Sequence, residues 1–384
     1  MSIQRVQAFP VRYPEPNNDG KVRSICLVRV EADDGAVGWG EAITGAQEVS
    51  LATAFLVERR LAPIVVGRRV ADANDVRAAW QAMRDATYWD GNGGIVTFGI
   101  SAIDMALWDL AGRIAGVPVH ALLSDRTPTS LPACASTILA TGDLDRVAQE
   151  FAGFVAQGFP MVKGGWGHDL SIAFGRDETR DLAVGRAVRA AVGPDTPVIL
   201  DVVALAGWDA DHAIRMCRAL EDQVGLYWFE DALPEQDVAG YRALRAAATT
   251  RICTGEKGWH EAHFRTLIDA GAIDVVMLDP AKAEGITGSW RVIAAAAAAG
   301  MSWNAHAWSS ALDTAASLHL AAATDNTLLM ELKPLPSPMQ DELVTNPIHQ
   351  VGGRVHVPTG AGLGVEVDAA VVRAYGFTED DLGR

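Results

Sequence analysis

Five side chains that can bind a cation or move a proton each follow a short apolar run in the second half of the chain. They are Asp201, Glu230, Glu256, Asp279 and His306. Successive members are separated by 29, 26, 23 and 27 residues, which is the length of one strand-plus-helix unit. A single acidic residue after a strand is more often a helix N-cap, but five in consecutive register favour a shared site. In a barrel of such units the carboxyl ends of the strands meet at one mouth, where we expect these side chains to converge.

The types of these side chains indicate two kinds of chemistry. Carboxylates crowded into a mouth of low dielectric repel one another, so a cation must neutralise them. Asp201, Glu230 and Glu256 are consecutive in the series and offer the oxygen donors that Mg²⁺ prefers, so we expect them to bind this ion. Asp279 and His306 remain, one strand apart. A carboxylate beside a histidine orients the ring and raises its basicity, so this dyad is the expected general base.

The elements that must position these residues alternate from about Leu131 onward. Strands are expected at 161–162, 198–200, 226–229, 252–253, 275–278 and 301–304, with helices at 179–192, 213–221, 238–248, 261–270 and 288–299. This alternation predicts an α/β fold with a parallel sheet, and five or more such units in series favour a barrel. The preceding segment of roughly 125 residues is typical of an α+β unit. Its strands are expected at 3–11, 22–31 and 37–40, and its clearest helix at 101–114.

Composition excludes several classes of partner. The chain has 384 residues, and its 48 acidic and 32 basic side chains give a net charge of −16, which argues against nucleic acid or an anionic membrane. An acidic substrate must therefore meet cations inside the site. The four cysteines show no metal or redox spacing, which favours the reducing cytoplasm. No signal peptide is apparent, and the most apolar stretch, Val292–Ala299, is too short to span a bilayer.

Several short motifs are spread over nearly the whole chain. They are Gly38-Trp-Gly-Glu41, Ser101 to Gly112, Trp228-Phe-Glu-Asp231, Thr254-Gly-Glu256, Leu278 to Thr287, Asn304-Ala-His306, Leu318 to Ala322 and Gly362 to Val365. In this order and spacing they resemble the mandelate racemase branch of the enolase superfamily, of the mandelate racemase/muconate lactonizing enzyme type. The resemblance implies an α+β capping domain at 1–125, a modified TIM (β/α) barrel at 126–355, and a C-terminal segment at 356–384 that returns to the cap.

The resemblance also implies roles for individual residues. It assigns Mg²⁺ to Asp201, Glu230 and Glu256, and the base to the Asp279–His306 dyad, in agreement with the spacing argument. It further implies that the protein forms a homo-oligomer.

Two more residues are implied to contact the substrate carboxylate. Lys163 matches the cation that faces this carboxylate in the family, and Glu331 is expected to donate a hydrogen bond to it. Lys282, three residues after Asp279, is expected to support the dyad, and Lys257 and Lys282 are further candidates for binding the substrate. Substrate specificity is expected from cap loops at 13–21 and 42–48.

The sequence departs from the family pattern at two positions. Where the family commonly carries Lys-x-Lys or Lys-x-His, this chain has Lys163-Gly-Gly165, so the second base is missing. Racemisation by two opposed bases needs a group on each face of the substrate, so one histidine favours dehydration instead. His168 or Lys257 are the alternatives for the missing base. Val203 replaces an asparagine that is common two residues after the first ligand, so substrate contacts there must differ.

Three functions are compatible with these residues. The first is a lyase that dehydrates a small sugar acid, an aldonate or aldarate, to a 2-keto-3-deoxy acid. The second is an isomerase, either a cycloisomerase of a sugar lactone or anhydro-sugar acid, or an epimerase. The third is a sugar-acid-binding homologue without catalysis, which the missing base at Gly165 would explain. The identity of the sugar acid is left open by the sequence.

Overall fold

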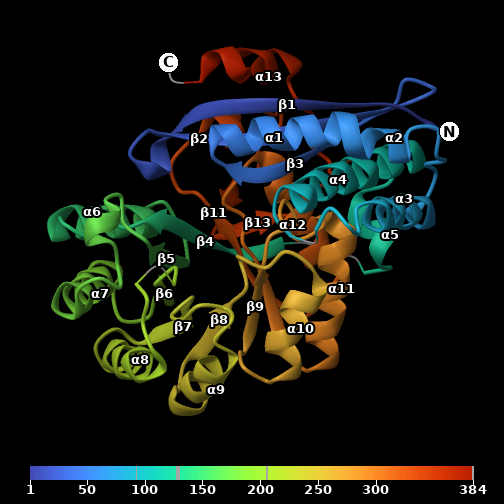
Figure 1. Cartoon of the computed structure of the whole chain (residues 1–384). Helices are drawn as coiled ribbons and strands as arrows, with labels where there is room; N and C mark the ends of the chain where they lie inside the picture. The colour runs from blue at the N-terminus through green and yellow to red at the C-terminus, as the bar shows by residue number, and fades with distance from the viewer. Residues whose placement is uncertain (92, 127–129, 205, 383–384) are drawn as a thin grey trace.

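The computed structural model describes residues 1–91, 93–126, 130–204 and 206–382 (Figure 1). An antiparallel sheet of β1 (Ile3–Glu15), β2 (Lys21–Ala32) and β3 (Val37–Gly45) forms the centre of an N-terminal cap. β1 and β2 pair along their whole length, from Ile3 opposite Ala32 to Glu15 opposite Lys21. They are longer than predicted because the pairing continues through the polar residues at the ends that face the barrel.

Helices complete the cap. They are α1 (Gln47–Leu56), α2 (Ala62–Val65), α3 (Ala73–Ala86), α4 (Ile95–Ala115) and α5 (Val119–Leu123), with a π-helical turn at Val57–Leu61. α1 and α4 make most of the contacts between these helices and the sheet. α4 lies directly against β3, because a Cβ on Gly38 or Gly40 would collide with the backbone of α4. This close packing explains the two glycines of the Gly-Trp-Gly-Glu motif.

α4 also corrects the prediction about apolar stretches. By length and composition alone it is long and apolar enough to cross a membrane, unlike Val292–Ala299. However, 89% of its apolar window is buried inside the fold, where it forms the core of the cap.

The remainder of the described chain builds a closed parallel barrel (Figure 1). Its strands are β4 (Ser130–Ile138), β5 (Met161–Gly165), β6 (Val198–Asp201), β7 (Leu226–Glu230), β8 (Arg251–Thr254), β9 (Val275–Leu278), β10 (Ser302–Ala305) and β11 (Thr327–Leu332). Pairing of β11 with β4 closes the barrel. The outer helices are α6 (Leu144–Ala156), α7 (Glu178–Val192), α8 (Ala210–Val224), α9 (Val238–Ala247), α10 (Glu261–Asp269), α11 (Gly285–Ala298) and α12 (Ala311–Ala322). The α/β barrel fold with an α+β cap is therefore confirmed.

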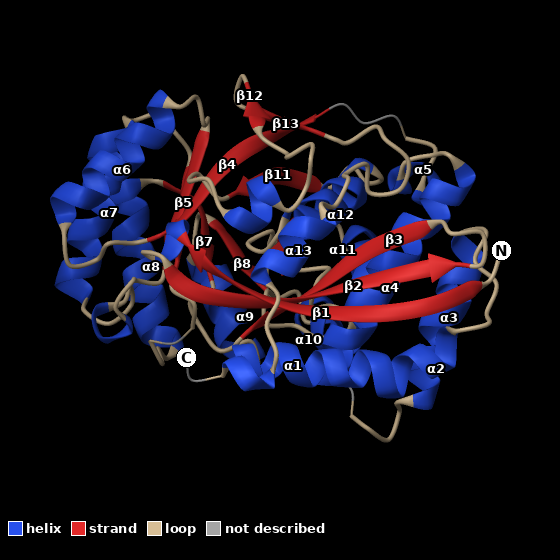
Figure 2. Ribbon diagram, turned by 90° about the horizontal axis from the view of Figure 1, so that it is seen from above, coloured by secondary structure: helices blue, strands red, loops and turns tan. Residues whose placement is uncertain are grey.

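The C-terminal residues return to the cap. After a short hairpin of β12 (Gln350–Val351) and β13 (Arg354–His356), which pairs with β4, α13 (Ala369–Tyr375) lies across β1. The backbone N–H of Phe377 donates to the carbonyl of Pro10 over 3.2 Å. Figure 2 shows the cap sheet lying over the α11 and α12 side of the barrel. The division of the chain at residues 125 and 355 stays a prediction.

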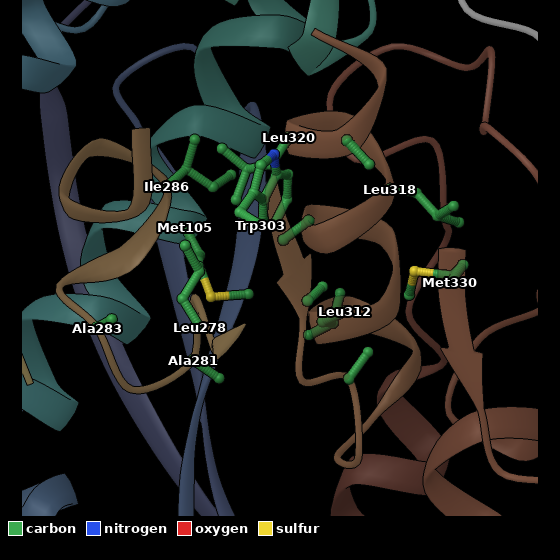
Figure 3. Close-up of a cluster of buried hydrophobic side chains, with 14 of the residues drawn as sticks. Met105, Leu278, Ala281, Ala283, Ile286, Trp303, Leu312, Leu318, Leu320 and Met330 are labelled. Atoms are coloured by element: carbon green, nitrogen blue, oxygen red, sulfur yellow. The ribbon is translucent and has the colours of Figure 1, made fainter. Parts of the chain in front are cut away.

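Two apolar clusters hold these layers in place. Figure 3 shows the first, in which Met105 of α4 lies near Leu278 of β9 and Trp303 of β10, so the cap and barrel share one core. The second fills the barrel interior and consists of Cys134, Met161, Ile199, Trp228, Cys253, Val275, Met277 and Leu329. Side chains alternate along a strand, so the residue two positions after each of these also faces inward. The interior is therefore apolar at one end and charged at the mouth.

Candidate active site

Three carboxylates meet at the mouth of the barrel. One oxygen each from Asp201, Glu230 and Glu256 lies within 4.8 Å of the others. Asp201 and Glu230 end the paired strands β6 and β7 and are directly opposite in register. Glu230 is oriented by the indole N–H of Trp228, which donates to its Oε2 over 2.8 Å. No pattern in the sequence pointed to this role of Trp228.

The positive charge of Lys163 does not neutralise all of these carboxylates. The Nζ of Lys163 lies 2.5 Å from Glu230 Oε1, 2.9 Å from Glu331 Oε1 and 3.3 Å from Asp201 Oδ2. Burial nevertheless raises the pKa of Asp201 and of Glu230 against the effect of Lys163. The Oε2 of Glu331 is buried without a hydrogen-bond partner.

This chemistry fits a divalent cation. Three hard oxygen donors that converge on one point, in a buried site with too little positive charge, are the environment in which a divalent ion such as Mg²⁺ binds. A dication there would stabilise the charged forms of the carboxylates whose pKa burial raises.

The Asp279–His306 dyad lies beside this cluster. Nδ1 of His306 is 2.8 Å from Asp279 Oδ2 and donates to it, which leaves Nε2 as the proton acceptor, 3.4 Å from Glu256 Oε2. The backbone N–H of Ala281 donates to the other oxygen of Asp279 over 2.7 Å. Burial alone would lower the pKa of His306, but Glu256 and Asp279 outweigh it and raise the pKa.

A second acidic pair lies behind the dyad and was missed by the sequence analysis. Both oxygens of Asp313 are buried without a hydrogen-bond donor, and burial raises the pKa of Asp313 well above its usual value, with Asp279 adding to the effect. Glu41 accepts hydrogen bonds from Ser310, and burial raises its pKa to about 7. No pattern in the sequence links Asp313 to the dyad, because His306 lies in the loop after β10 and Asp313 lies on α12, which begins only at Ala311.

Gly165 lies where strands β5 and β6 approach closely. A Cβ at this position would lie 2.6 Å from Asp201 Cβ and 2.8 Å from the Asp201 carbonyl oxygen. Both distances are shorter than a van der Waals contact between non-bonded atoms, so a side chain at 165 would displace Asp201. The absence of a second base therefore has a steric cause in this chain.

The two alternative bases occupy different environments. Lys257 donates to Asp231 and lies 3.2 Å from Glu256 Oε1; burial opposes its charge, but Asp231 and Glu256 outweigh it and raise the pKa of Lys257. His168 lies with Nδ1 3.5 Å from Asp19 Oδ2, and burial lowers its pKa. A protonated Lys257 is a poor base, and both ring nitrogens of His168 are engaged, Nδ1 with Asn18 and Asp19 and Nε2 with Arg146 over 3.4 Å, so neither residue offers a free second base.

The turn after Asp201 orients this carboxylate through the backbone. Val203 has a φ of 63°, an unusual conformation for a β-branched residue. In this conformation its backbone N–H donates to Asp201 Oδ1 over 2.8 Å. The backbone therefore orients Asp201.

The dyad and part of the acidic cluster line one cavity of about 530 Å³, which is the size range of small-molecule sites. The barrel supplies the floor, including Lys163, Asp201, Asp279, His306 and Glu331, and also Lys257 and Lys282. Lys282 lies with Nζ 4.3 Å from the centre of the Trp259 ring. The cap supplies the facing wall, formed by Asn18, Lys21, Val22, Arg23, Ile43 and Gly45. The two predicted cap loops contribute to this wall, but Arg23 lies outside both and was missed.

Comparison with known proteins places this site in context. Residues 18–124 match the family model of the mandelate racemase/muconate lactonizing enzyme N-terminal domain, and residues 146–371 match the enolase C-terminal domain-like model. The chain is 29% identical to D-galactarolactone cycloisomerase of Agrobacterium fabrum, over 90% of this chain and 89% of that protein. It is 33% identical to L-rhamnonate dehydratase of Saccharopolyspora erythraea, over 90% of this chain and 83% of that protein.

Two solved structures have the same overall fold. The 3,6-anhydro-D-galactonate cycloisomerase from Zobellia galactanivorans superposes with a TM-score of 0.87, is 26% identical, and is matched over 98% of this chain and 100% of its own. A racemase from Streptomyces coelicolor A3(2), solved with bound magnesium, superposes with a TM-score of 0.85 at 26% identity, over 98% and 100% of the two chains.

Proposed function

Because the chain belongs to the enolase superfamily, as a member of the mandelate racemase/muconate lactonizing enzyme type, we propose that it is a sugar-acid dehydratase. In this proposal it removes the α-proton of an aldonate or aldarate and expels the β-hydroxyl as water. The product is a 2-keto-3-deoxy acid. The dehydratase and cycloisomerase names of its relatives support an enzyme that acts on acid sugars.

Dehydration is favoured because the cavity has a base on the His306 side and no base at position 165. His306 provides an imidazole on one side of the cavity, whereas Gly165 cannot carry a base without displacing Asp201. Epimerisation or racemisation by two bases is therefore disfavoured. A single histidine can first accept a proton and then return it to the leaving oxygen.

The proposed mechanism uses the residues of the floor. Lys163 holds the substrate carboxylate, and its ammonium offsets the negative charge that develops there when the α-proton leaves. Glu331 holds the same carboxylate through a hydrogen bond. A bound Mg²⁺, held by Asp201, Glu230 and Glu256, would supply Lewis-acid stabilisation of that charge.

Proton transfer then proceeds through the dyad. Nε2 of His306 accepts the α-proton, and Asp279 stabilises the imidazolium that results. The electron pair of the broken C–H bond forms the C=C bond of an enol as the C–O bond to the β-hydroxyl breaks. His306 returns the proton to this leaving oxygen, so water departs. The enol then takes up a proton at C3 from solvent and releases its C2 hydroxyl proton to solvent, which gives the 2-keto-3-deoxy acid.

A variant of the base tests the proposal. His306→Asn retains a group of similar shape that can hydrogen-bond to Asp279 but cannot accept a proton. We expect at least a thousand-fold loss of 2-keto acid formation from an acid-sugar library with Mg²⁺, on the order of the upper range for general acid–base catalysis. His356→Asn, which changes an exposed histidine on β13, is the matched control and should keep full activity. Normal turnover by His306→Asn would refute the dyad assignment.

Cycloisomerisation is the second candidate, favoured by the names of one relative and one solved structure. It begins with the same proton abstraction, but the group expelled is a ring oxygen, so the product keeps the mass of the substrate. Mass spectrometry of the product distinguishes the two reactions, because only dehydration removes 18 mass units, the mass of water.

We also propose that the protein acts in the cytoplasm as a homo-oligomer. The free state of all four cysteines, each buried, supports a reducing compartment. Native mass spectrometry tests the assembly.

A further inference from the structure

The cap wall of the cavity contains a cation without a partner. Arg23 lines the cavity from β2, and its Nε is buried without a hydrogen-bond acceptor. Within the part of the chain that the structure describes, Arg23 forms no ion pair. A guanidinium that lines a cavity without a counter-ion stabilises an anion bound beside it.

Two cations of the floor are already paired with carboxylates. Lys163 is surrounded by Asp201, Glu230 and Glu331, and Lys257 is held by Asp231 and Glu256. Among the described residues, Lys282, which lies over the Trp259 ring on the floor, and Arg23 on the cap wall line the cavity without an ion pair.

The acidic residues of the cap nearest to Arg23 are engaged elsewhere. Glu15 Oε2 accepts a hydrogen bond from Lys333 over 2.7 Å, and Glu41 accepts from Ser310. Both side chains are fully buried. Neither is therefore free to neutralise Arg23.

Two contacts fix the position of Arg23 in the cavity. Its guanidinium carbon lies 5.0 Å from the centre of the Trp308 ring, and the Trp308 indole N–H donates to the Ser136 carbonyl over 3.1 Å. A guanidinium that lies over an aromatic ring still directs its N–H groups outward in its own plane, where they can bind both oxygens of a carboxylate. Lys21 lies two residues earlier on β2, projects to the same face, and lines the same cavity.

We propose that Arg23, with Lys21 beside it, forms a second anion subsite on the cap wall, and that the substrate carries a second carboxylate at the end away from the reacting carbon. The substrate class is then a dicarboxylic sugar acid, an aldarate or its lactone, rather than an aldonate. This inference rests on the proposed function, because it assumes that the floor binds the reacting carboxylate at Lys163.

Matched acids provide the test. Glucarate and galactarate are compared with gluconate and galactonate, which differ only in having a hydroxymethyl group in place of the second carboxylate. Binding to the Mg²⁺-loaded protein is measured by calorimetry, and α-proton exchange by NMR in deuterated water. We expect an aldarate to bind about 30-fold or more tightly than its aldonate, the range for one desolvated charge pair.

Arg23→Met keeps the stem that packs on Trp308 but removes the charge. We expect it to weaken aldarate binding by about 30-fold or more and to change aldonate binding by less than about threefold. Arg29→Met is the matched control, because Arg29 lies on the same strand but pairs with Glu31, 2.6 Å away, and does not line the cavity. It should leave both affinities unchanged.

Other outcomes overturn the inference. Equal binding of aldarate and aldonate by the unchanged protein refutes the second subsite. Tighter binding of 6-phosphogluconate than of glucarate assigns the subsite to a phosphate ester and refutes the second carboxylate. If aldonates undergo α-proton exchange and the protein shows no preference for aldarates, the inference is refuted but the proposed function is not. If none of the four acids undergoes exchange, the proposed function fails, and the calorimetric preference still decides whether the subsite exists.

Discussion

At position 165 a glycine lies against Asp201, and the lack of a side chain there has two effects. It removes the second base from the cavity, and it leaves room for the carboxylate that begins the proposed metal site. Sequence comparison with the family reveals only the first effect. The second depends on the distance between two neighbouring strands, which no spacing of residue types encodes.

We predict that even the smallest side chain at this position disturbs the metal site. Gly165→Ala should weaken Mg²⁺ binding by about 10- to 100-fold, the range for changes that misplace a ligand, as measured by calorimetry. Gly153→Ala is the control, because a Cβ there meets no atom within 4 Å. An unchanged Mg²⁺ affinity in Gly165→Ala would show that Asp201 tolerates the displacement.

Asp313 provides a second prediction at this scale. Because burial raises its pKa well above the usual value, the folded state holds a proton that the unfolded state loses above about pH 4. Ionisation of the unfolded chain therefore destabilises the protein at neutral pH. Asp313→Asn removes this effect and preserves a donor toward Asp279, so we expect a gain of about 1–3 kcal/mol at pH 7.

Urea unfolding at pH 7 measures this change. Asp380→Asn, at an exposed position near the C-terminus, should alter stability by less than about 0.5 kcal/mol. A loss of stability in Asp313→Asn would mean that the native carboxylate is charged and bound by a donor.

At the scale of elements, the alternation of strands and helices was largely readable from the sequence. The predicted strands that precede Asp201, Glu230, Glu256, Asp279 and His306 correspond to β6 to β10, because each is a run of apolar residues of the expected length. The strands that close the barrel, β4 and β11, were not among the predicted runs. β4 is rich in alanine, serine and threonine, and β11 contains leucine and methionine, which also favour helices. Neither segment is therefore recognisable as a strand from its residue types.

The residues that the sequence analysis missed lie where two elements meet. Arg23 belongs to the cap and Trp308 to a loop of the barrel, and their contact depends on how the cap sits on the barrel. Asp313 lies on α12, behind the dyad. Local periodicity predicts an element and its buried face, but it does not predict which residues of another element will lie opposite.

The contact between cap helix α4 and barrel helix α11 gives a prediction at this scale. Thr287 Oγ1 accepts from the Trp108 indole over 2.9 Å and donates to Asp104 over 2.6 Å. Thr287→Val leaves two buried polar groups without this partner. We expect a loss of about 2–4 kcal/mol in the free energy of unfolding, measured with urea.

Thr266→Val is the matched control, because Thr266 lies on the exposed surface of α10. Its effect should stay within about 0.5 kcal/mol. Equal effects of the two substitutions would show that the hydrogen bonds between the helices contribute nothing to stability.

At the scale of the whole molecule, one buried histidine joins three distant segments. His319 of α12 donates through Nε2 to the carbonyl of Leu363 over 3.1 Å, and Nδ1 accepts from the backbone N–H of His120 over 3.4 Å. This arrangement requires the neutral ring. Burial lowers the pKa of His319 to about 3.

The lowered pKa predicts acid sensitivity. Because the folded pKa lies below the unfolded value of about 6.5, the stabilisation is fully present above pH 6.5 and is lost progressively as the pH falls toward 3. The total loss should be a few kcal/mol. Thermal unfolding of His319→Gln should show a flatter dependence on pH over this window, whereas the exposed His356→Gln should follow the unchanged protein. If the unfolding temperature of all three proteins changes with pH in the same way, the assignment of the acid sensitivity to His319 is wrong.

The hydrogen bond from Phe377 to Pro10 has a consequence for synthesis of the protein. The first strand of the cap makes contacts with residues that are synthesised more than 360 positions later. During translation the barrel strands can therefore pair while this side of the cap is still uncovered. This side of the cap is covered only when α13 has left the ribosome and docked on β1.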